Sequence, residues 1–423
     1  MINQKEKHVP QIRFREFKDE WIEQPIGQVL SEVKRTISLE DEKLYELITV
    51  KRRNEGVVSR GHLFGRNILV KNYSQLETGD FVISKRQVVH GATGIVAAHL
   101  NKAIVSNEYL VAAENEDIST GFFNILSSLP DMKRKFLLSS YGVDIEKLFF
   151  DAEDWKKRKV IIPKKVEQVH INMYFNVLDE IIVLHQRKHD KLLMLKKAML
   201  KKMFPKKGTL IPEIRFKGFN GDWKERDLGD IMQPISNNSL SRSYLNPIAG
   251  IAKNVHYGDV LVKFGDVIDV EKENIPFITD ENIINRLASS KLIDGDIVIA
   301  DAAEDLSVGK CSELFNVGKD LVFAGLHTIA LRPLIKFAPT YLGYFINSNA
   351  FHDQLLPLMQ GTKVLSISKV ALKDTKIIFP CDLDEQRKIG SYFLHMDNLI
   401  SNYSKQVDKL KKIKLACLEK MFV

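Results

Sequence analysis

Two short segments of the sequence combine side chains that can read the edges of nucleic-acid bases. They are VKRRNEG, which begins at Val50, and SKRQVVHG, which begins at Ser84. Arginine and lysine donate hydrogen bonds to guanine, whereas asparagine and glutamine pair with adenine. With one arginine between them, these segments supply the first candidates: Lys51, Arg52, Arg53, Asn54, Arg60, Lys85, Arg86, Gln87 and His90.

The second half of the chain supplies a different set of candidates. One is Lys263, and the others lie in the segments AGLHTIAL and QGTKVLSIS: His327, Gln360, Thr362, Lys363 and Ser366. For each residue taken singly, a solvated surface is the alternative, because charged side chains on loops usually serve solubility. Taken together, the clusters predict loops that contact bases.

The two sets differ at matching places. After Gly79-Asp80 the chain reads FVISKRQVVHGATG, and after Gly295-Asp296 it reads IVIADAAEDLSVGK. In this register Lys85 aligns with Asp301, so one scaffold carries a basic loop and an acidic one. This difference is what we expect of two binding domains with different targets, because a duplicated enzyme would keep its catalytic residues in both copies.

Motifs for catalysis are absent from the sequence. There is no GxxxxGK[ST] phosphate loop, no HExxH, and no glycine-rich loop with the NPP[YF] type of motif that an adenine methyltransferase needs. A PD…DxK nuclease pattern can be assembled from Pro130-Asp131 and Asp154-Trp155-Lys156, but the second half has no counterpart. We therefore expect no catalytic residues and no metal site in this chain.

Composition narrows the class of protein. The chain has 423 residues, 44% of them hydrophobic, and a net charge of +8, which favours a polyanionic partner. Its three cysteines form no CxxC pair, which is typical of a reducing compartment. No apolar stretch approaches the length of a membrane span, so we expect a cytoplasmic protein.

Elements that position the loops are visible as two repeats. PQIRFREFKDEW begins at Pro10 and PEIRFKGFNGDW at Pro212, an offset of 202 residues. EQVHINMYFNVLDEII begins at Glu167 and EQRKIGSYFLHMDNLI at Glu385, an offset of 218. We interpret the first repeat as a duplicated structural junction whose aromatic residues belong to a core.

The second repeat opens two long segments with helical periodicity, residues 166–205 and 384–423. Apolar residues recur at three- and four-residue steps and predict a seam between the two helices: Ile171, Tyr174, Leu178, Ile181, Leu192, Leu195 and Met199 in the first, and Ile389, Tyr392, Met396, Leu399, Leu410 and Ile413 in the second. We predict an antiparallel coiled coil; two separate surface helices are the alternative.

Polar residues interrupt the middle of this seam, at His185 and Lys188 in the first helix and at Tyr403 and Gln406 in the second. Such residues fix the register of a coiled coil; otherwise the helices splay there. From Arg187 to Lys207 nine lysines or arginines accompany one aspartate, either as a solvated face or as a track beside phosphates.

The remaining blocks, residues 1–165 and 206–383, read as mixed α and β. Each contains a Gly-Asp turn followed by an alternating apolar strand, and each ends in a strand that stops at proline, KVIIP or KIIFP. The predicted fold class is α+β: two tandem mixed domains and two long helices, related by a pseudo-twofold.

With these features the chain resembles the specificity subunits of type I restriction–modification systems. The resemblance rests on the order and duplication of the IRF…F…W openings, GDFVISKR and GDIVIAD, GTKVLSIS before IIFP, and the EQ helices ending in MF. One departure is GVDIEKLFF in the first block, where the second has GTKVLSIS, which leaves open what corresponds to Thr362 and Lys363 there.

The resemblance implies a non-catalytic subunit with two target-recognition domains, each reading half of a bipartite double-stranded DNA site. It implies that the helices set the distance between the half-sites and bind two modification (methyltransferase) subunits, which restriction subunits join. S-adenosylmethionine, ATP and Mg would then be needed only in those partners. The alternatives are an enzyme with a cryptic nuclease or methyltransferase site, and a coiled-coil adaptor for proteins.

Overall fold

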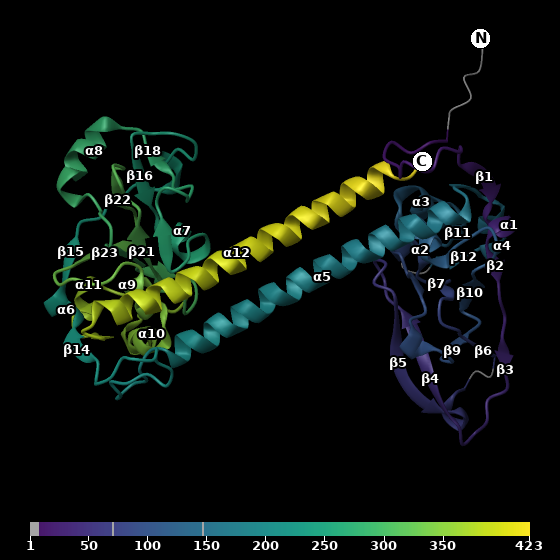
Figure 1. The fold of residues 1–423 in the computed structure, drawn as a ribbon, viewed down its shortest axis with the longest axis horizontal. Helices are drawn as coiled ribbons and strands as arrows, with labels where there is room; N and C mark the ends of the chain where they lie inside the picture. Colours follow the sequence, from purple (N-terminus) through teal and green to yellow (C-terminus); the bar gives the residue numbers. More distant parts are fainter. Residues whose placement is uncertain (1–7, 70–71, 146–147) are drawn as a thin grey trace, which may run out of the picture. The chain divides into compact units, whose positions relative to one another are not determined.

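A computed structural model describes residues 8–69, 72–145 and 148–423 (Figure 1). Contacts divide the chain into two compact units: Met1–Leu184 with Val407–Val423, and His185–Gln406. The two long helices α5 (Lys165–Lys202) and α12 (Leu383–Lys420) each contribute one part to each unit. The mixed α/β fold with two long helices is therefore confirmed.

The first unit is built on two small sheets. One has the strand order β2 (Ser31–Glu32), β10 (Tyr109–Ala113), β7 (Phe81–Ser84), β8 (Thr93–Ile95). The other has the order β3 (Thr36–Ile37), β6 (Tyr73–Gln75), β9 (Ile104–Ser106), β4 (Leu44–Val50), β5 (Val57–Phe64). Apolar side chains of both sheets pack together in a core, which holds the long β4–β5 hairpin in place.

Short helices and strand pairs complete this unit. They are α1 (Ile26–Val29), α2 (Thr120–Ser128), α3 (Pro130–Leu138) and α4 (Ala152–Lys157), with β1 (Ile22–Pro25) paired to β13 (Lys159–Ile162) and β11 (Ser140–Tyr141) to β12 (Phe149–Phe150). Trp155 is fully buried and stacks on Phe136 with ring centroids 5.3 Å apart. This aromatic core joins α2, α3 and α4 to α5.

The second unit repeats the plan with a five-stranded and a three-stranded sheet. Its five-stranded sheet has the order β15 (Met232–Ile235), β23 (Thr328–Pro333), β19 (Ile297–Ala300), β21 (Cys311–Phe315), β17 (Val267–Asp269). Its three-stranded sheet has the order β18 (Phe277–Ile278), β16 (Ala252–Val255), β22 (Val322–Ala324), and β14 (Lys224–Asp227) pairs with β25 (Lys376–Phe379). The Gly-Asp turn predicted before each central strand precedes β7 in one unit and β19 in the other.

Helices of the second unit lie against these sheets and against α12. They are α6 (Leu228–Ile231), α7 (Tyr257–Val262), α8 (Glu281–Leu287), α9 (Tyr341–Asn347), α10 (Asn349–Leu355) and α11 (Lys369–Leu372). In Figure 1 the three-stranded sheet and α8 lie at the end of the unit away from α12. Ile389, Phe393 and Met396 of α12 are buried in the same core as α9 and the five-stranded sheet.

The long helices pair antiparallel within each unit. In the first unit Asp179 of α5 bonds Lys414 of α12 at 2.6 Å, and in the second Lys196 of α5 bonds Asp397 of α12 at 2.5 Å. Later residues of α5 therefore meet earlier residues of α12. His185 packs edge-on against Tyr403 with ring centroids 5.5 Å apart, so the polar middle of the seam does not splay.

Most of the residues predicted for the seam between α5 and α12 are buried or half-buried, but three are exposed. Ile171, Leu178, Ile389 and Met396 are buried, and Tyr174, Leu192, Met199, Tyr392, Leu399 and Leu410 are half-buried. Ile181, Leu195 and Ile413 are corrections, because 36%, 44% and 38% of their surfaces are exposed.

Steps of four and three residues explain these corrections. The buried and half-buried positions of α5 are spaced in this way and pass through Phe175, Ile182 and Lys196, one residue after the predicted Tyr174, Ile181 and Leu195. In α12 the same spacing places Lys414, rather than Ile413, in the seam. A prediction from apolar residues misses these lysines, because the sequence pattern does not show that a carboxylate of the partner helix neutralises each of them.

The duplicated IRF segment is a junction, as predicted. Arg13 makes two hydrogen bonds, of 2.7 and 2.6 Å, to the buried carboxylate of Glu167 in the first turn of α5. Arg215 bonds Glu385 at the start of α12 in the same way, at 2.7 and 2.8 Å. The next glutamine of each EQ pair, Gln168 or Gln386, accepts a backbone N–H from its own unit.

Candidate DNA interface

The β4–β5 turn of the first unit brings two of the predicted segments together. Arg53 and Asn54 have φ angles of 60° and 57°, a left-handed conformation that few residues other than glycine adopt. Their backbone N–H groups donate to the carbonyls of His90 and Gly91, both at 2.8 Å. Across this contact Arg52 Nε donates to Gln87 Oε1 at 2.7 Å.

We call this cluster the first surface, defined by Lys51, Arg52, Arg53, Asn54, Gln87 and His90. Its lysine and arginines are exposed. Guanidinium and ammonium donors next to amide side chains suit guanine and adenine edges. Asn54 is the exception within the cluster, because its amide donates inward to Thr93 Oγ1 at 3.0 Å.

Three further candidates of this unit lie outside the cluster. Lys85 donates to the carbonyl of Asn107 at 2.8 Å, and Arg86 pairs with Glu108 at 2.7 Å, so both side chains are bound to the β9–β10 turn. The hydrogen bond to Glu108 raises the pKa of Arg86. Arg60 is exposed on β5, and no hydrogen bond within the described residues joins it to the first surface.

In the second unit three distant segments meet beside Asp301. The residue follows β19, and its backbone N–H donates to the carbonyl of His327 at 3.1 Å while its carbonyl accepts the N–H of Ile367 at 2.9 Å. His327 Nδ1 lies 3.3 Å from Asp301 Oδ1, and Tyr257 packs on the imidazole with ring centroids 5.2 Å apart.

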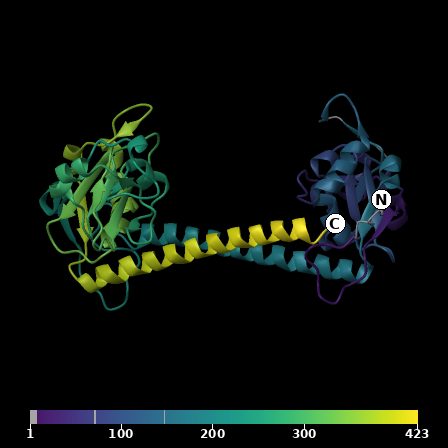
Figure 2. The ribbon, with the colours of Figure 1, turned by 90° about the horizontal axis from the view of Figure 1, so that it is seen from above.

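We call this cluster the second surface, defined by Tyr257, Asp301, His327 and the hairpin of residues 360–366. Gln360 and Ser366 close the hairpin with two backbone hydrogen bonds, and its strand β24 (Leu365–Ser366) pairs with β20 (Ala302–Ala303). Figure 2 shows the hairpin in yellow-green on the side of the unit away from α12. Thr362 and Lys363 are exposed at its tip.

Lys263 is not joined to the second surface. It lies at the end of α7, where its ammonium donates to the carbonyl of Asn274 and lies 5.2 Å from the centre of the Phe264 ring. The sequence also gave no sign of Tyr257 as a member of the surface, and it placed Asp301 only in an acidic loop. The alignment of Lys85 with Asp301 was the signal that could have selected it.

A structural counterpart of the hairpin exists in the first unit. The β11–β12 hairpin precedes α4 and β13, as the 360–366 hairpin precedes α11 and β25. Gly142 directly follows β11 with a φ of 155°, and Gly361 follows Gln360 in the 360–366 hairpin with a φ of 116°. A Cβ on Gly361 would meet the carbonyl of Val364 at 2.0 Å, so only glycine fits that turn.

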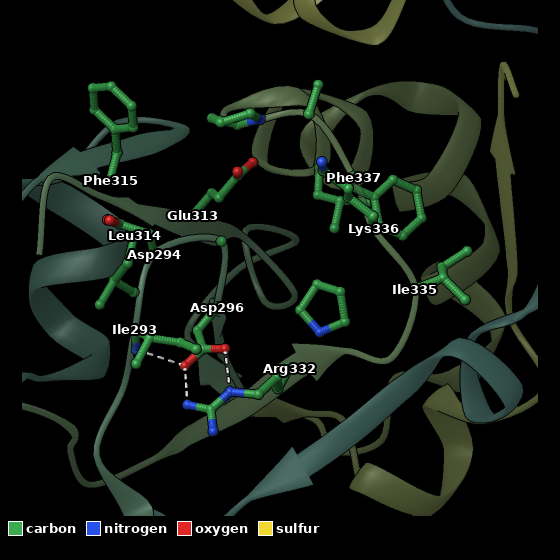
Figure 3. A pocket seen from close by; sticks show the side chains of 15 residues that line it. Ile293, Asp294, Asp296, Glu313, Leu314, Phe315, Arg332, Ile335, Lys336 and Phe337 are labelled. Atoms are coloured by element: carbon green, nitrogen blue, oxygen red, sulfur yellow. Dashed lines mark hydrogen bonds and ion pairs between the residues drawn. The ribbon is translucent and has the colours of Figure 1, made fainter. Parts of the chain in front are cut away.

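Figure 3 shows a separate cavity of about 300 Å³ in the second unit. In its wall the buried Asp296 accepts two hydrogen bonds from Arg332, at 2.9 and 2.7 Å, and one from the backbone of Ile293. The buried Glu313 accepts the N–H groups of Thr340 and Gly343, at the start of α9. These bonds make the cavity wall a structural support for β19, β21 and α9.

Neither a grouped set of metal ligands nor a membrane-spanning helix is present among the described residues. Outside residues 1–7, 70–71 and 146–147, no three His, Cys, Asp or Glu side chains are grouped so that they could hold a metal ion. Within the same ranges no helix combines the length and the apolar character of a membrane span.

The second half of the chain is similar to a known protein family. Residues 220–412 match the Type I restriction modification DNA specificity domain. These residues form a domain of this family. Asp301, His327 and the 360–366 hairpin of the second surface all lie inside the matched residues.

One curated relative and two solved structures extend the comparison. A 210-residue segment is 28% identical to the MjaX specificity subunit, a type I restriction enzyme subunit of Methanocaldococcus jannaschii, and covers 48% of this chain but only 45% of the relative. The type I restriction–modification S subunit of M. genitalium shares the fold over 98% of this chain and 99% of its own, with 14% identity and a TM-score of 0.52.

The second solved structure comes from work on complex assembly and conformational transition of the type I system. It shares 18% identity, covers 97% of this chain and 99% of its own, and has a TM-score of 0.50. At these identities the two structures show the fold alone, over nearly the whole length of this chain.

Proposed function

We propose that this chain is the DNA-reading subunit of a type I restriction–modification complex. It reads an asymmetric bipartite site in double-stranded DNA and directs adenine methylation or cleavage by partner subunits. One observation carries the proposal: two units share a scaffold but present different side chains after the matching strands β7 and β19. The first surface offers cationic and amide groups, whereas the second offers Asp301, His327 and Lys363.

In this function each mixed domain reads one half-site, with residues 1–165 and 206–383 as the two target-recognition domains. The helices at 166–205 and 384–423 bind two modification subunits, and restriction subunits join that assembly in the cytoplasm. Methyl transfer, ATP hydrolysis and Mg binding belong to the partners, so this chain acts by binding alone. Its net charge of +8 supports a polyanionic ligand.

The test exchanges one reader for another. Residues 22–162, from the start of β1 to the end of β13, are replaced by the matching segment of another family member, and the complex is assembled with the same modification subunits. Mapping of methylated adenines should show one changed half-site, with the other half-site and the spacer unchanged. Two half-sites that change together would contradict independent readers.

Two further measurements separate this function from the alternatives. An adaptor for proteins alone would show no binding to duplex DNA, whereas a DNA reader should bind with an affinity that falls steeply as salt rises, because it contacts several phosphates. A cryptic enzyme would transfer methyl groups or cut DNA as the isolated chain.

A further inference from the structure

Asp301 has a free acceptor at the surface of the second unit. Its Oδ1 is buried and lies 3.3 Å from Nδ1 of His327, its ion-pair partner. The side chain still has 27% of its surface exposed. Its other oxygen, Oδ2, accepts no hydrogen bond from the described residues, and unlike Oδ1 it is accessible to solvent. Oδ2 is therefore an acceptor open to a ligand.

The surroundings hold this carboxylate in one orientation. His327 lies on one side with a φ of 54°, a conformation that costs a non-glycine residue free energy. Tyr257 packs against the imidazole, and the N–H of Ile367 holds the Asp301 carbonyl. Burial raises the pKa of Asp301, and the charge of His327 opposes this effect. An oriented carboxylate loses little entropy when it binds.

We propose that Asp301 reads the 4-amino group of a cytosine in the half-site bound by the second unit, and that His327 positions its carboxylate. This inference rests on the proposed function and names the chemistry of one of its contacts. A carboxylate only accepts hydrogen bonds, and among base edges in the major groove it suits the amine of cytosine. In the alignment of the two units the neighbouring Ala302 stands where the first unit has Arg86, so no long cationic side chain follows Asp301.

The charge difference between the units gives the inference its direction. Lys85 occupies the position in the first unit that Asp301 occupies in the second, at the end of the matching central strand. A donor there suits guanine, and an acceptor suits cytosine. The structure thus assigns opposite hydrogen-bonding roles to one place on the duplicated scaffold.

The first step of the test defines the wild-type motif. The full chain, assembled with its modification subunits, selects sites from a random duplex DNA library. The half-site that changes when residues 224–379 are exchanged belongs to the second unit. If the wild type selects no bipartite motif, the proposed function fails before this inference is reached.

The second step removes single amino groups. Duplexes carry 2-pyrimidinone, which lacks the 4-amino group, in place of each cytosine of that half-site in turn. We expect one position at which the wild type loses about fivefold or more in affinity and at which Asp301→Ala loses nothing further. Asp301→Asn should shift the preference there from cytosine to adenine, because an amide pairs with the adenine edge.

Controls distinguish reading from structural support. Glu304→Gln changes a carboxylate on the same loop, which is exposed, and should leave the motif unchanged. The first half-site serves as an internal control in every variant. The assignment of Asp301 is wrong if Asp301→Ala weakens binding to all sequences equally, or if this variant still loses affinity when the amino group is removed. It is also wrong if Asp301→Asn keeps the wild-type preference for cytosine.

Discussion

At the scale of single residues, the buried ion pair of each junction ties a domain to its long helix. Glu167 is only 2% exposed and depends on the two hydrogen bonds from Arg13. Glu385 is 1% exposed and depends in the same way on Arg215. A carboxylate this deeply buried is stable only while its partner is present.

Arg13→Ala should lower the free energy of unfolding of the first unit by about 3–5 kcal/mol, because it leaves an uncompensated buried charge. Urea unfolding measures the loss. Arg15→Ala, an exposed neighbour on the same segment, should change stability by less than about 0.5 kcal/mol. Equal effects of the two variants would show that Glu167 does not need Arg13.

Glu313 predicts a dependence of stability on pH. Burial raises its pKa from 4.5 to about 8, although backbone N–H groups at the start of α9 oppose the shift. Between these two values the folded state keeps a proton that the unfolded state loses. Stability of the second unit is therefore highest at the acidic end of this window and falls as pH rises, by up to about 1.4 kcal/mol per pH unit.

Glu313→Gln should remove this slope. The glutamine side chain has one acceptor oxygen, whereas the carboxyl group of Glu313 accepts hydrogen bonds from two backbone N–H groups. The variant should therefore also be less stable at every pH, by about 1–3 kcal/mol. Thermal unfolding of wild type and variant between about pH 5 and about pH 8.5 gives both quantities. A variant that keeps the wild-type slope would assign the effect to another group.

At the scale of elements, the internal repeat places the same lysine–aspartate ion pair at two positions in the helix seam. Asp179 and Asp397 are 218 residues apart, as are Lys196 and Lys414. The lysine of each helix meets the aspartate of the other. The copies differ in depth: Lys196 and its two carboxylates are 13–30% exposed, whereas Lys414 and Asp179 are 32% and 49% exposed.

Lys196→Met should lower the stability of the second unit by about 3–5 kcal/mol, because Asp266 and Asp397 both lose their cation in a mostly buried site. Lys414→Met should lower that of the first unit by at most about 1 kcal/mol, since solvent screens the more exposed pair. Lys197→Met is the exposed control. Equal costs for Lys196 and Lys414 would contradict burial as the deciding factor.

At the scale of the whole molecule, helix length should set the number of base pairs between the half-sites. The polar middle of the seam, around Leu184 in α5 and Gln406 in α12, is also where the chain divides into its two units. A seven-residue insertion after each of these residues keeps the four-three spacing of both seams.

Such a double insertion adds about 10 Å to each helix, so the spacer should lengthen by about three base pairs at 3.4 Å per pair. Both half-sites should stay the same, because the reading loops are untouched. The methylated motif before and after gives the answer. An insertion in α5 alone should instead destabilise the pairing. An unchanged spacer in a folded, active double variant would leave the helices a role only in binding partners.

The sequence alone determined the duplication, the two long helices, the mixed domains and the family resemblance. These are properties of local order: identities at a fixed offset and apolar residues at helical spacing are visible without coordinates. The same local reading placed the loop candidates in clusters, and Arg52 and Arg53 do contact Gln87 and His90 in the first surface.

Only the tertiary structure decided which residues act together across the chain. Lys196 and Lys414 belong to the seam because the partner helix brings an aspartate to each, which a pattern of apolar residues cannot show. Asp301 gains His327 and Ile367 as neighbours because β19 and β24 end, and β23 begins, at one place in the second unit. Charge and hydrogen bonding depend on such distant partners, whereas periodicity depends only on neighbours along the chain.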